Sequence, residues 1–217
     1  MSLFSFYPSD PMYLLKPLVL ASQSPRRVSL LNQIGLPPQV LPSNVPENFE
    51  DRLSPAENAI RLALLKAKEI ATQCNDAFVI GADTIVVLHG ELLSKPIDEK
   101  DAQRMLRLLS GRTHTVVTGF AIVDCPTGIS ATEYESTAVT FREMPEEEIE
   151  QYVASGSPMD KAGAYGIQDD YGAVFVTRIE GCFYNVVGFP LSKFYSTLQK
   201  FQSQFSEMKG AVYVKEH

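Results

Sequence analysis

The sequence predicts one compact domain of the α/β or α+β class, built on a mixed β-sheet. Three observations support this. Apolar runs rich in β-branched residues, such as Phe78–Leu88, are interspersed with amphipathic helical segments, without strict alternation. The 217 residues are 45% hydrophobic, enough for a sizeable core. No Pro/Gly/Ser-rich linker divides the middle, and this length fits one large domain or two small ones at about 150 residues each. We therefore expect one domain, with a division into two lobes as an alternative.

The first half of the chain predicts a strand and two helices. Residues 18–21 form a short apolar run typical of a strand. Ser24 then serves as N-cap, Pro25 takes the first helical position, and Gly35 ends this helix. Ser54 opens a capping box, from which a long helix runs to about residue 72. Residues 1–17, with three prolines, are expected to form an irregular N-terminal extension.

The second half predicts the rest of the sheet and three more helices. Phe78–Leu88 is expected to be a buried strand, and residues 91–94 are expected to form a second strand that pairs with it after a turn. Asp98 is the expected N-cap of a helix that ends near residue 110. The other expected elements are a hairpin of residues 113–123 and 129–142, a helix opened by Pro145, a Gly-rich loop over 156–172, a hairpin of 173–179 and 182–187, and a helix from Leu191. Residues 202–217 are a tail in which 212–214 have the composition of a strand.

Charge and cysteine content exclude several classes of protein. Acidic residues outnumber basic ones by 26 to 19, and the net charge of −7 disfavours nucleic-acid and membrane-surface partners while allowing a local basic pocket. Cys74, Cys125 and Cys182 are scattered, which argues against a disulfide framework or a structural zinc site. No apolar run reaches the roughly 18 residues of a membrane span. We therefore expect a cytoplasmic protein.

An anion site is predicted where the first strand meets its helix. Arg26 and Arg27 lie in the first helical turn, where cations oppose the helix dipole and acids are the usual choice. Free N–H groups at a helix start bind anions, and arginine grips phosphate with two hydrogen bonds. Phosphate binding is therefore one interpretation of this pair, and a solvated surface pair is the other.

Two charged residues occupy positions that should be apolar. Asp83 interrupts the buried strand, where a charge is costly unless it is paired or binds a metal, and Gly81 and Ala82 beside it leave space for a ligand. A structural carboxylate that caps a loop is the alternative. Lys66 lies on or beside the apolar stripe of the long helix, and this pattern alone favours a lysine at the core edge that extends its amine to solvent.

Four further residues have weaker signals. Lys95 would add a positive charge to the cluster formed by the two arginines. Asp98 is sufficiently explained as the N-cap of the helix that follows it, and Glu47 as an acidic residue on the surface. The loop over 156–168 is long enough to bind a ligand, unless it is a plain surface loop, and the amide of Gln168 suits a nucleobase edge. Phosphate-binding and dinucleotide-binding glycine motifs are absent, as are the serine-hydrolase and zinc-protease motifs.

Seven segments in this order resemble the Maf family of nucleotide pyrophosphatases. The resemblance covers residues 18–201, which defines the expected catalytic domain. The segments are LASQSPRR (20–27), RLALLKA (61–67), GADTIV (81–86), KPIDEKDA (95–102), MLRLLSGRTHTVVTG (105–119), MDKAGAYGIQ (159–168) and NVVGFPL (185–191). Each is weak alone, but seven in order are specific.

The resemblance implies a mixed α/β fold with a deep cleft, often a homodimer, and a house-cleaning role. It implies hydrolysis of nucleoside triphosphates to the monophosphate and pyrophosphate, with a divalent metal, most simply Mg²⁺. Asp83 corresponds to the proton acceptor. The phosphate-binding positions fall on Ser22, Arg26, Arg27, Lys66 and Lys95, and the metal-binding acids on Glu47, Asp83 and Asp98.

Within the family, the resemblance favours the branch that acts on dTTP and UTP, with modified pyrimidine triphosphates as further candidates. Arg26, Thr84 and Gln168 match its specificity positions, and Thr84 argues against the 7-methyl-GTP branch. Departures from the family pattern are Gln23, Pro46 and the pair at 169–170. The alternatives are a pyrophosphatase for another nucleotide and a non-catalytic, nucleotide-binding regulator of cell division.

Overall fold

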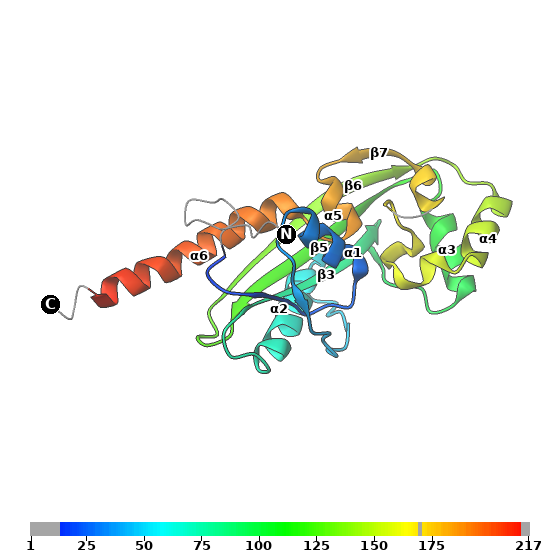
Figure 1. Cartoon of the computed structure of the whole chain (residues 1–217). Helices are drawn as coiled ribbons and strands as arrows, with labels where there is room; N and C mark the ends of the chain where they lie inside the picture. The colour runs from blue at the N-terminus through cyan, green and yellow to red at the C-terminus, as the bar shows by residue number, and fades with distance from the viewer. Residues whose placement is uncertain (1–13, 169–170, 214–217) are drawn as a thin grey trace, which may run out of the picture.

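The structure, a computed structural model, describes residues 14–168 and 171–213, and side chains as far as residue 205. Its centre is a seven-stranded mixed sheet in the order β2-β1-β3-β5-β6-β7, with β4 also paired to β3 (Figure 1). The strands are β1 (Leu18–Leu20), β2 (Gln39–Val40), β3 (Phe78–Leu88), β4 (Glu91–Leu93), β5 (Thr113–Asp124), β6 (Ser130–Phe141) and β7 (Val176–Glu180). The predicted mixed sheet is therefore confirmed.

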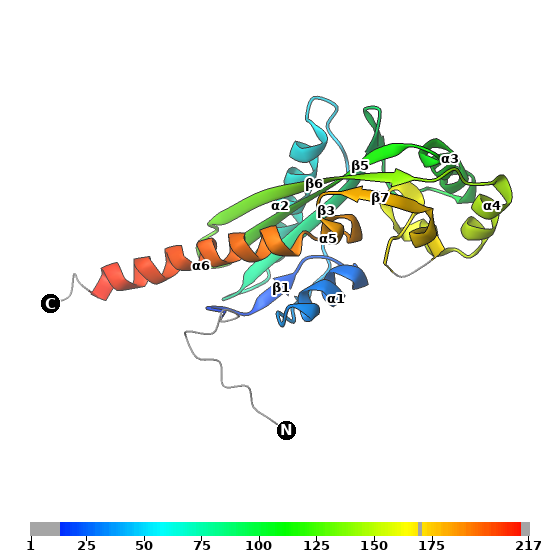
Figure 2. The same ribbon diagram turned by 90° about the horizontal axis from the view of Figure 1, so that it is seen from above.

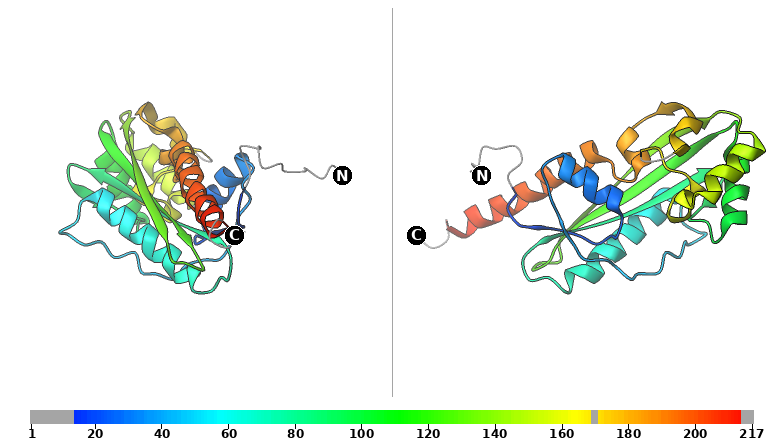
Figure 3. Two further views of the ribbon diagram at one scale, coloured as in Figure 1. Left: turned by 90° about the vertical axis from the view of Figure 1, so that its left-hand side faces the viewer. Right: turned by 45° about the vertical axis from the view of Figure 1, so that its right-hand side comes forward.

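Helices cover both faces of this sheet. Helix α2 lies on one face, whereas α1, α5 and α6 lie on the other (Figures 2 and 3). Helices α3 and α4 gather at one end of the molecule, and α6 projects beyond the sheet at the opposite end (Figure 1). No helix in the described part of the chain is long and apolar enough to cross a membrane. The helices are α1 (Pro25–Gln33), α2 (Pro55–Ala71), α3 (Glu99–Leu109), α4 (Glu146–Ala154), α5 (Phe183–Val187) and α6 (Leu191–Tyr213), with short 3₁₀ turns η1 (Ser157–Asp160), η2 (Ala162–Ala164) and η3 (Tyr171–Phe175).

Local capping chemistry sets the helix starts that the sequence predicted. Ser54 and Glu57 form the complete capping box of α2, since each side chain bonds the other residue's backbone N–H. The carboxylate of Asp98 accepts from the backbone N–H of Asp101 and caps α3. Three acids occupy the first turn of α4 and complement its dipole.

Two segments predicted to be strands are helical instead. The second strand expected at 182–187 is helix α5, because Gly181, at φ 127°, ends β7 and the carbonyl of Cys182 accepts the first helical hydrogen bonds. The strand expected at 212–214 is contradicted as far as Tyr213, where α6 still continues, and residue 214 lies outside the described residues. Helix α6 continues because Phe201 and Phe205 pack on Phe78 and stabilise it past residue 201.

Strand β3 has an opening along one edge. Strand β1 pairs with it at Phe78–Ile80, and β4 pairs with it again from Val86 onward. Between these two partners, residues 81–85 have β5 on one edge and, within the described part of the chain, no strand on the other. Both faces of β3 can therefore be reached from this opening.

Close packing of α2 against the sheet depends on two glycines. A Cβ on Gly81 would lie 2.0 Å from the carbonyl oxygen of Ala63, and a Cβ on Gly119 would lie 2.4 Å from the carbonyl carbon of Ala59. The expectation that Gly81 and Ala82 leave room for a ligand is therefore wrong. The helix backbone fills the space beside Gly81, and Ala82 is fully buried in the core on the other face.

We predict that Gly81→Ala lowers the free energy of unfolding by about 3 kcal/mol or more, because α2 has to move away from the sheet. Gly128→Ala is the matched control, since its Cβ meets no atom within 4 Å and only the positive φ costs stability, by about 1 kcal/mol. Urea unfolding measures both variants. Equal losses would contradict the packing argument.

Candidate active site

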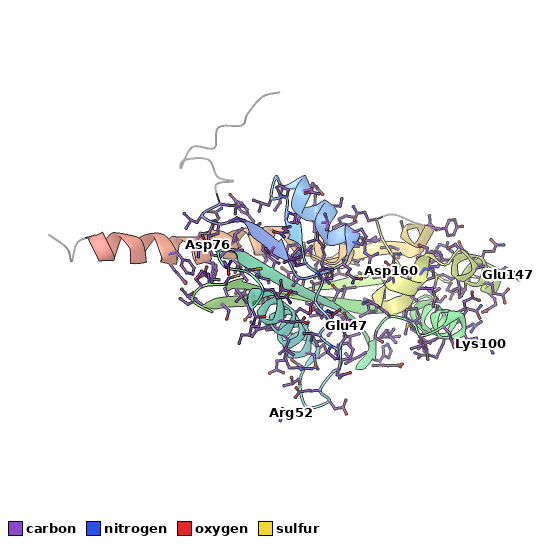
Figure 4. The ribbon with its side chains drawn as sticks, turned by 60° about the horizontal axis from the view of Figure 1, so that its bottom comes forward. Glu47, Arg52, Asp76, Lys100, Glu147 and Asp160 are labelled. Atoms are coloured by element: carbon purple, nitrogen blue, oxygen red, sulfur yellow. The ribbon has the colours of Figure 1, made fainter. Side chains whose placement is uncertain are left out.

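A cavity of about 440 Å³ lies at the open edge of β3. Its walls come from the loop between β1 and α1, the segment before α2, the segment after β4 and the loop that contains η1 and η2. Figure 4 shows Glu47 and Asp160, which belong to two of these walls. The predicted site residues that line the cavity are Ser22, Arg26, Arg27, Glu47, Lys66, Asp83, Thr84, Lys95 and Gln168.

Two consecutive residues of β3, Asp83 and Thr84, line this cavity from opposite faces of the strand. Side chains alternate along a strand, so Asp83 faces α2 and Thr84 faces α1 and α5. On the α2 side the lining is charged. On the other side it includes Val116, Tyr165 and Val186 together with the guanidinium of Arg27, so apolar side chains border the cavity on this side of β3.

A buried ion pair forms the floor of the charged side. Lys66 Nζ donates to Asp83 Oδ1 at 2.6 Å and to Glu47 Oε1 at 2.7 Å. The side chains of Lys66 and Asp83 are 8% and 7% exposed, so the lysine does not extend to solvent and the aspartate does not cap a loop. Lys95 Nζ contacts the other Glu47 oxygen at 3.1 Å. Glu47 thus joins both lysines, although its side chain is 42% exposed, so it is a surface acid that also takes part in the site.

The two carboxylates have opposite pKa shifts. Burial raises the pKa of Asp83, although the charge and hydrogen bond of Lys66 oppose this. Burial would also raise the pKa of Glu47, but hydrogen bonds and charges from Lys66 and Lys95 lower it to about 2. A carboxylate with a raised pKa is suited to accept a proton, whereas Glu47 stays ionised.

The guanidinium of Arg27 is held by three protein oxygens. Nε donates to the Gly188 carbonyl at 3.0 Å, Nη1 to Ser22 Oγ at 3.0 Å, and Nη2 to Thr84 Oγ1 at 3.1 Å. A guanidinium carries five N–H groups, so one on each of Nη1 and Nη2 remains for an anion. Arg27 therefore shapes the site as well as supplying charge.

Arg26 reaches across the cavity mouth to the opposite wall. Its Nη1 donates to Asp160 Oδ2 at 3.1 Å, and Lys161 Nζ donates to Asp160 Oδ1 at 2.9 Å and to the Ser157 carbonyl at 2.5 Å. Asp160 and Lys161 both line the cavity. The sequence indicated this loop as a ligand-binding segment but did not single out these two residues.

Asp98 is the one predicted site residue that does not line the cavity. Its side chain is exposed and engaged as the N-cap of α3. Of the three acids predicted to bind a metal, the structure brings together Glu47 and Asp83, which share Lys66.

The donor set around Lys66 fits magnesium only in combination with a bound phosphate. Among the described residues, no group of three or more histidine, cysteine or acidic side chains could hold a metal ion. Magnesium is typically bound by one or two carboxylates together with substrate phosphates and water. Glu47 and Asp83 would supply the two carboxylates of such a site.

Comparison with known proteins identifies the family. Residues 17–201 match the family model described as Maf-like protein, and the chain belongs to the Maf family. A Moorella thermoacetica relative is 52% identical over 174 residues, which cover 80% of this chain and 89% of the relative. A Caldicellulosiruptor saccharolyticus relative is 44% identical over 90% of this chain and 99% of its own, and one from Pelotomaculum thermopropionicum is 46% identical over 86% and 97%. Each of the three is named a dTTP/UTP pyrophosphatase.

We predict that Glu47 stabilises the fold above its ordinary pKa of 4.5 and that this contribution disappears as the pH falls toward 2. The sign follows because the folded protein binds this proton less tightly than the unfolded chain does. The difference in unfolding free energy between the wild type and Glu47→Gln, measured from pH 6 to about pH 2, should shrink over that window. A difference that does not change with pH would contradict the Glu47–lysine contacts.

Proposed function

We propose that this protein hydrolyses UTP and dTTP to the nucleoside monophosphate and pyrophosphate. The observation that carries the proposal is the Asp83–Lys66 pair, buried in the floor of a cavity whose rim holds further cations. The names of its Maf relatives support the choice of substrate. Modified pyrimidine triphosphates are further candidates of the same class.

The charges at the cavity suit a triphosphate. Arg26, Arg27 and Ser22 surround the start of α1, where backbone N–H groups also favour an anion, and α1 has no acidic residue in its first turn. Lys66 and Lys95 face them from the α2 side of β3. Hydrolysis of a phosphoanhydride depends mainly on positioning and on stabilising negative charge, which these side chains supply.

Asp83 is the proposed general base. Its Oδ1 is bonded to Lys66, which fixes the carboxylate and leaves Oδ2 to accept a proton from water. The water oxygen attacks the α-phosphorus, the bond from that phosphorus to the bridging oxygen breaks, and pyrophosphate leaves with that oxygen. Magnesium, held by Glu47 and Asp83 with phosphate oxygens, would neutralise charge on the triphosphate. Lys66, Lys95 and the arginines hold the phosphates in line.

The side of the cavity bordered by apolar side chains is the proposed base site. Val116, Tyr165 and Val186 offer apolar contacts there, and Thr84 and Gln168 offer polar groups to the edge of a base. Gln168 is exposed and Thr84 is half-buried, so the bound base would lie between an adjustable amide and a fixed hydroxyl.

A panel of nucleoside triphosphates, read by pyrophosphate release, tests the proposed function. UTP and dTTP should be turned over fastest, with one monophosphate formed for each pyrophosphate. Preferential turnover of 7-methyl-GTP or another nucleotide would replace the substrate. Tight nucleotide binding without turnover would instead support a non-catalytic regulator.

We predict that Asp83→Asn lowers kcat for UTP by roughly 10²–10⁴-fold, because the amide cannot accept the water proton. Asp76→Asn is the matched control, since Asp76 is an exposed partner of Lys16 and does not line the cavity. Steady-state pyrophosphate release measures both variants. Wild-type turnover by Asp83→Asn would contradict the role of Asp83.

We predict that a chelator abolishes turnover and that Mg²⁺ restores it. Glu47→Gln should raise the Mg²⁺ concentration needed for half-maximal rate by about tenfold or more, as expected when a metal-site residue is lost. Asp98→Asn should leave that concentration unchanged, because the Asp98 carboxylate caps α3 instead. A raised requirement in Asp98→Asn would restore the interpretation of Asp98 as a metal ligand.

A further inference from the structure

The segment that carries Glu47 has little structure of its own. Residues 41–53 connect β2 to α2 and contain neither a helix nor a strand. Glu47 projects from the middle of this segment with a side chain that is 42% exposed. Backbone N–H and carbonyl groups outside helices and strands need other partners, and an irregular segment loses conformational entropy when it is ordered. Groups from elsewhere in the molecule therefore have to fix the position of Glu47.

On the upstream side of Glu47, one carboxylate of α2 holds the segment. Glu69 Oε2 accepts two hydrogen bonds, from Ser43 Oγ at 2.5 Å and from the Asn44 N–H at 3.0 Å. Ser43 Oγ also accepts from the Val45 N–H at 3.2 Å. Glu69 therefore fixes the direction in which the chain approaches Glu47.

On the downstream side of Glu47, two further side chains of α2 hold the backbone. Arg61 Nη2 donates to the Asn48 carbonyl, and Arg61 Nε lies 3.3 Å from Glu50 Oε1. Asn58 Oδ1 accepts from the Glu50 N–H at 2.8 Å, and Asn58 Nδ2 donates to the Glu50 carbonyl at 3.0 Å. Residues that come later in the segment have partners that come earlier in α2, so the segment runs antiparallel along the helix.

The lysine contacts alone are a poor support for Glu47 once a triphosphate is bound. Lys66 and Lys95 contact the two carboxylate oxygens of Glu47 at 2.7 and 3.1 Å. Both amines are also proposed to bind phosphate, so phosphate oxygens compete with the Glu47 carboxylate for the same N–H donors. Glu69 and Arg61 do not line the cavity. Their contacts with the segment are therefore not subject to this competition.

We propose that Glu69 and Arg61 are positioning residues that hold Glu47 at the cavity. They bind the chain on either side of Glu47 and act through its backbone. The Glu47 carboxylate is thereby kept beside Asp83, with which it shares Lys66. This inference rests on the proposed function, because it concerns a carboxylate of the proposed magnesium site.

Calorimetry of ligand binding measures this role without turnover. The α,β-methylene analogue of UTP, in which carbon replaces the bridging oxygen that has to leave, is titrated into the wild type and Glu69→Ala at increasing Mg²⁺ concentrations. Glu69→Ala should need about tenfold more Mg²⁺ for half-maximal binding, the lower end of the effect of losing an outer partner of a metal ligand. Its kcat for UTP at saturating Mg²⁺ should stay close to that of the wild type, because Asp83 and Lys66 are unchanged.

Glu57→Ala is the matched control for a merely structural effect. It removes the same kind of side chain from the same helix, and the contacts of Glu57 with Ser54 lie outside residues 43–48. Loss of the capping box should lower the stability of the protein and leave the Mg²⁺ requirement unchanged. An equal rise of the Mg²⁺ requirement in Glu57→Ala would reduce the effect to a general loss of stability and overturn the inference.

A double-mutant cycle tests the same role on the free protein. Glu47→Gln, Glu69→Ala and the double variant are unfolded in urea at about pH 6, where the Glu47 carboxylate is ionised. If Glu69 holds Glu47 against the lysines, Glu47→Gln should raise the unfolding equilibrium constant by a smaller factor once Glu69 has been removed. The two factors should differ by about threefold or more. Arg61→Ala should show the same coupling to Glu47.

The outcomes separate this inference from the proposed function. Additive effects of Glu47→Gln and Glu69→Ala overturn the inference, as does an unchanged Mg²⁺ requirement in Glu69→Ala; both outcomes leave the pyrophosphatase intact. A wild type that neither binds nor hydrolyses UTP overturns the proposed function, and the cycle on the free protein then decides the positioning of Glu47 by itself. If Glu69→Ala does not fold, Arg61→Ala takes its place in both measurements, and additive effects there overturn the inference.

Discussion

The close contact between α2 and the sheet is the constraint on which the site depends. Gly81 and Gly119 let the helix backbone approach β3 and β5 to a distance that no side chain would permit. At that distance Lys66 reaches Asp83, so the carboxylate is buried beside a cation rather than alone. An unpaired charge in a buried strand would be costly, and a lysine held farther away could not offset that cost. The same contact brings Glu47, from the segment before α2, onto Lys66.

The opening along the edge of β3, between β1 and β4, leaves a cavity that is lined by side chains from both faces of the strand. Because side chains alternate along the strand, Asp83 of β3 faces Lys66 of α2 and the next residue, Thr84, faces Arg27 of α1. The molecule carries a net charge of −7, yet the cavity gathers arginines and lysines from four segments. Global charge argues against a polyanionic nucleic acid as ligand, and the local arrangement favours a small triphosphate.

The mixed sheet, the starts of several helices and most of the site residues could be predicted from the sequence, because they depend on local capping residues or on a charge within an apolar strand. Asp83 was prominent because it breaks an apolar strand, and the capping residues fixed the starts of α2 and α3. The failures have a physical cause in tertiary structure. Gly81 was interpreted as ligand space, but only the fold reveals the helix that fills it. Residues 182–187 have the composition of a strand, yet the chain leaves β7 at Gly181, which has a positive φ, and residues 183–187 form helix α5. Asp160 and Lys161 gave no separate signal, because their contacts at the cavity mouth depend on the tertiary structure.

The most direct test of the central claim, that water attacks the α-phosphorus of the bound triphosphate, is the fate of the water oxygen. UTP is hydrolysed in water enriched in heavy oxygen, and the two products are separated and weighed by mass spectrometry. The account predicts one heavy oxygen in the monophosphate and none in pyrophosphate. Heavy oxygen in pyrophosphate, or release of orthophosphate in place of pyrophosphate, would contradict it.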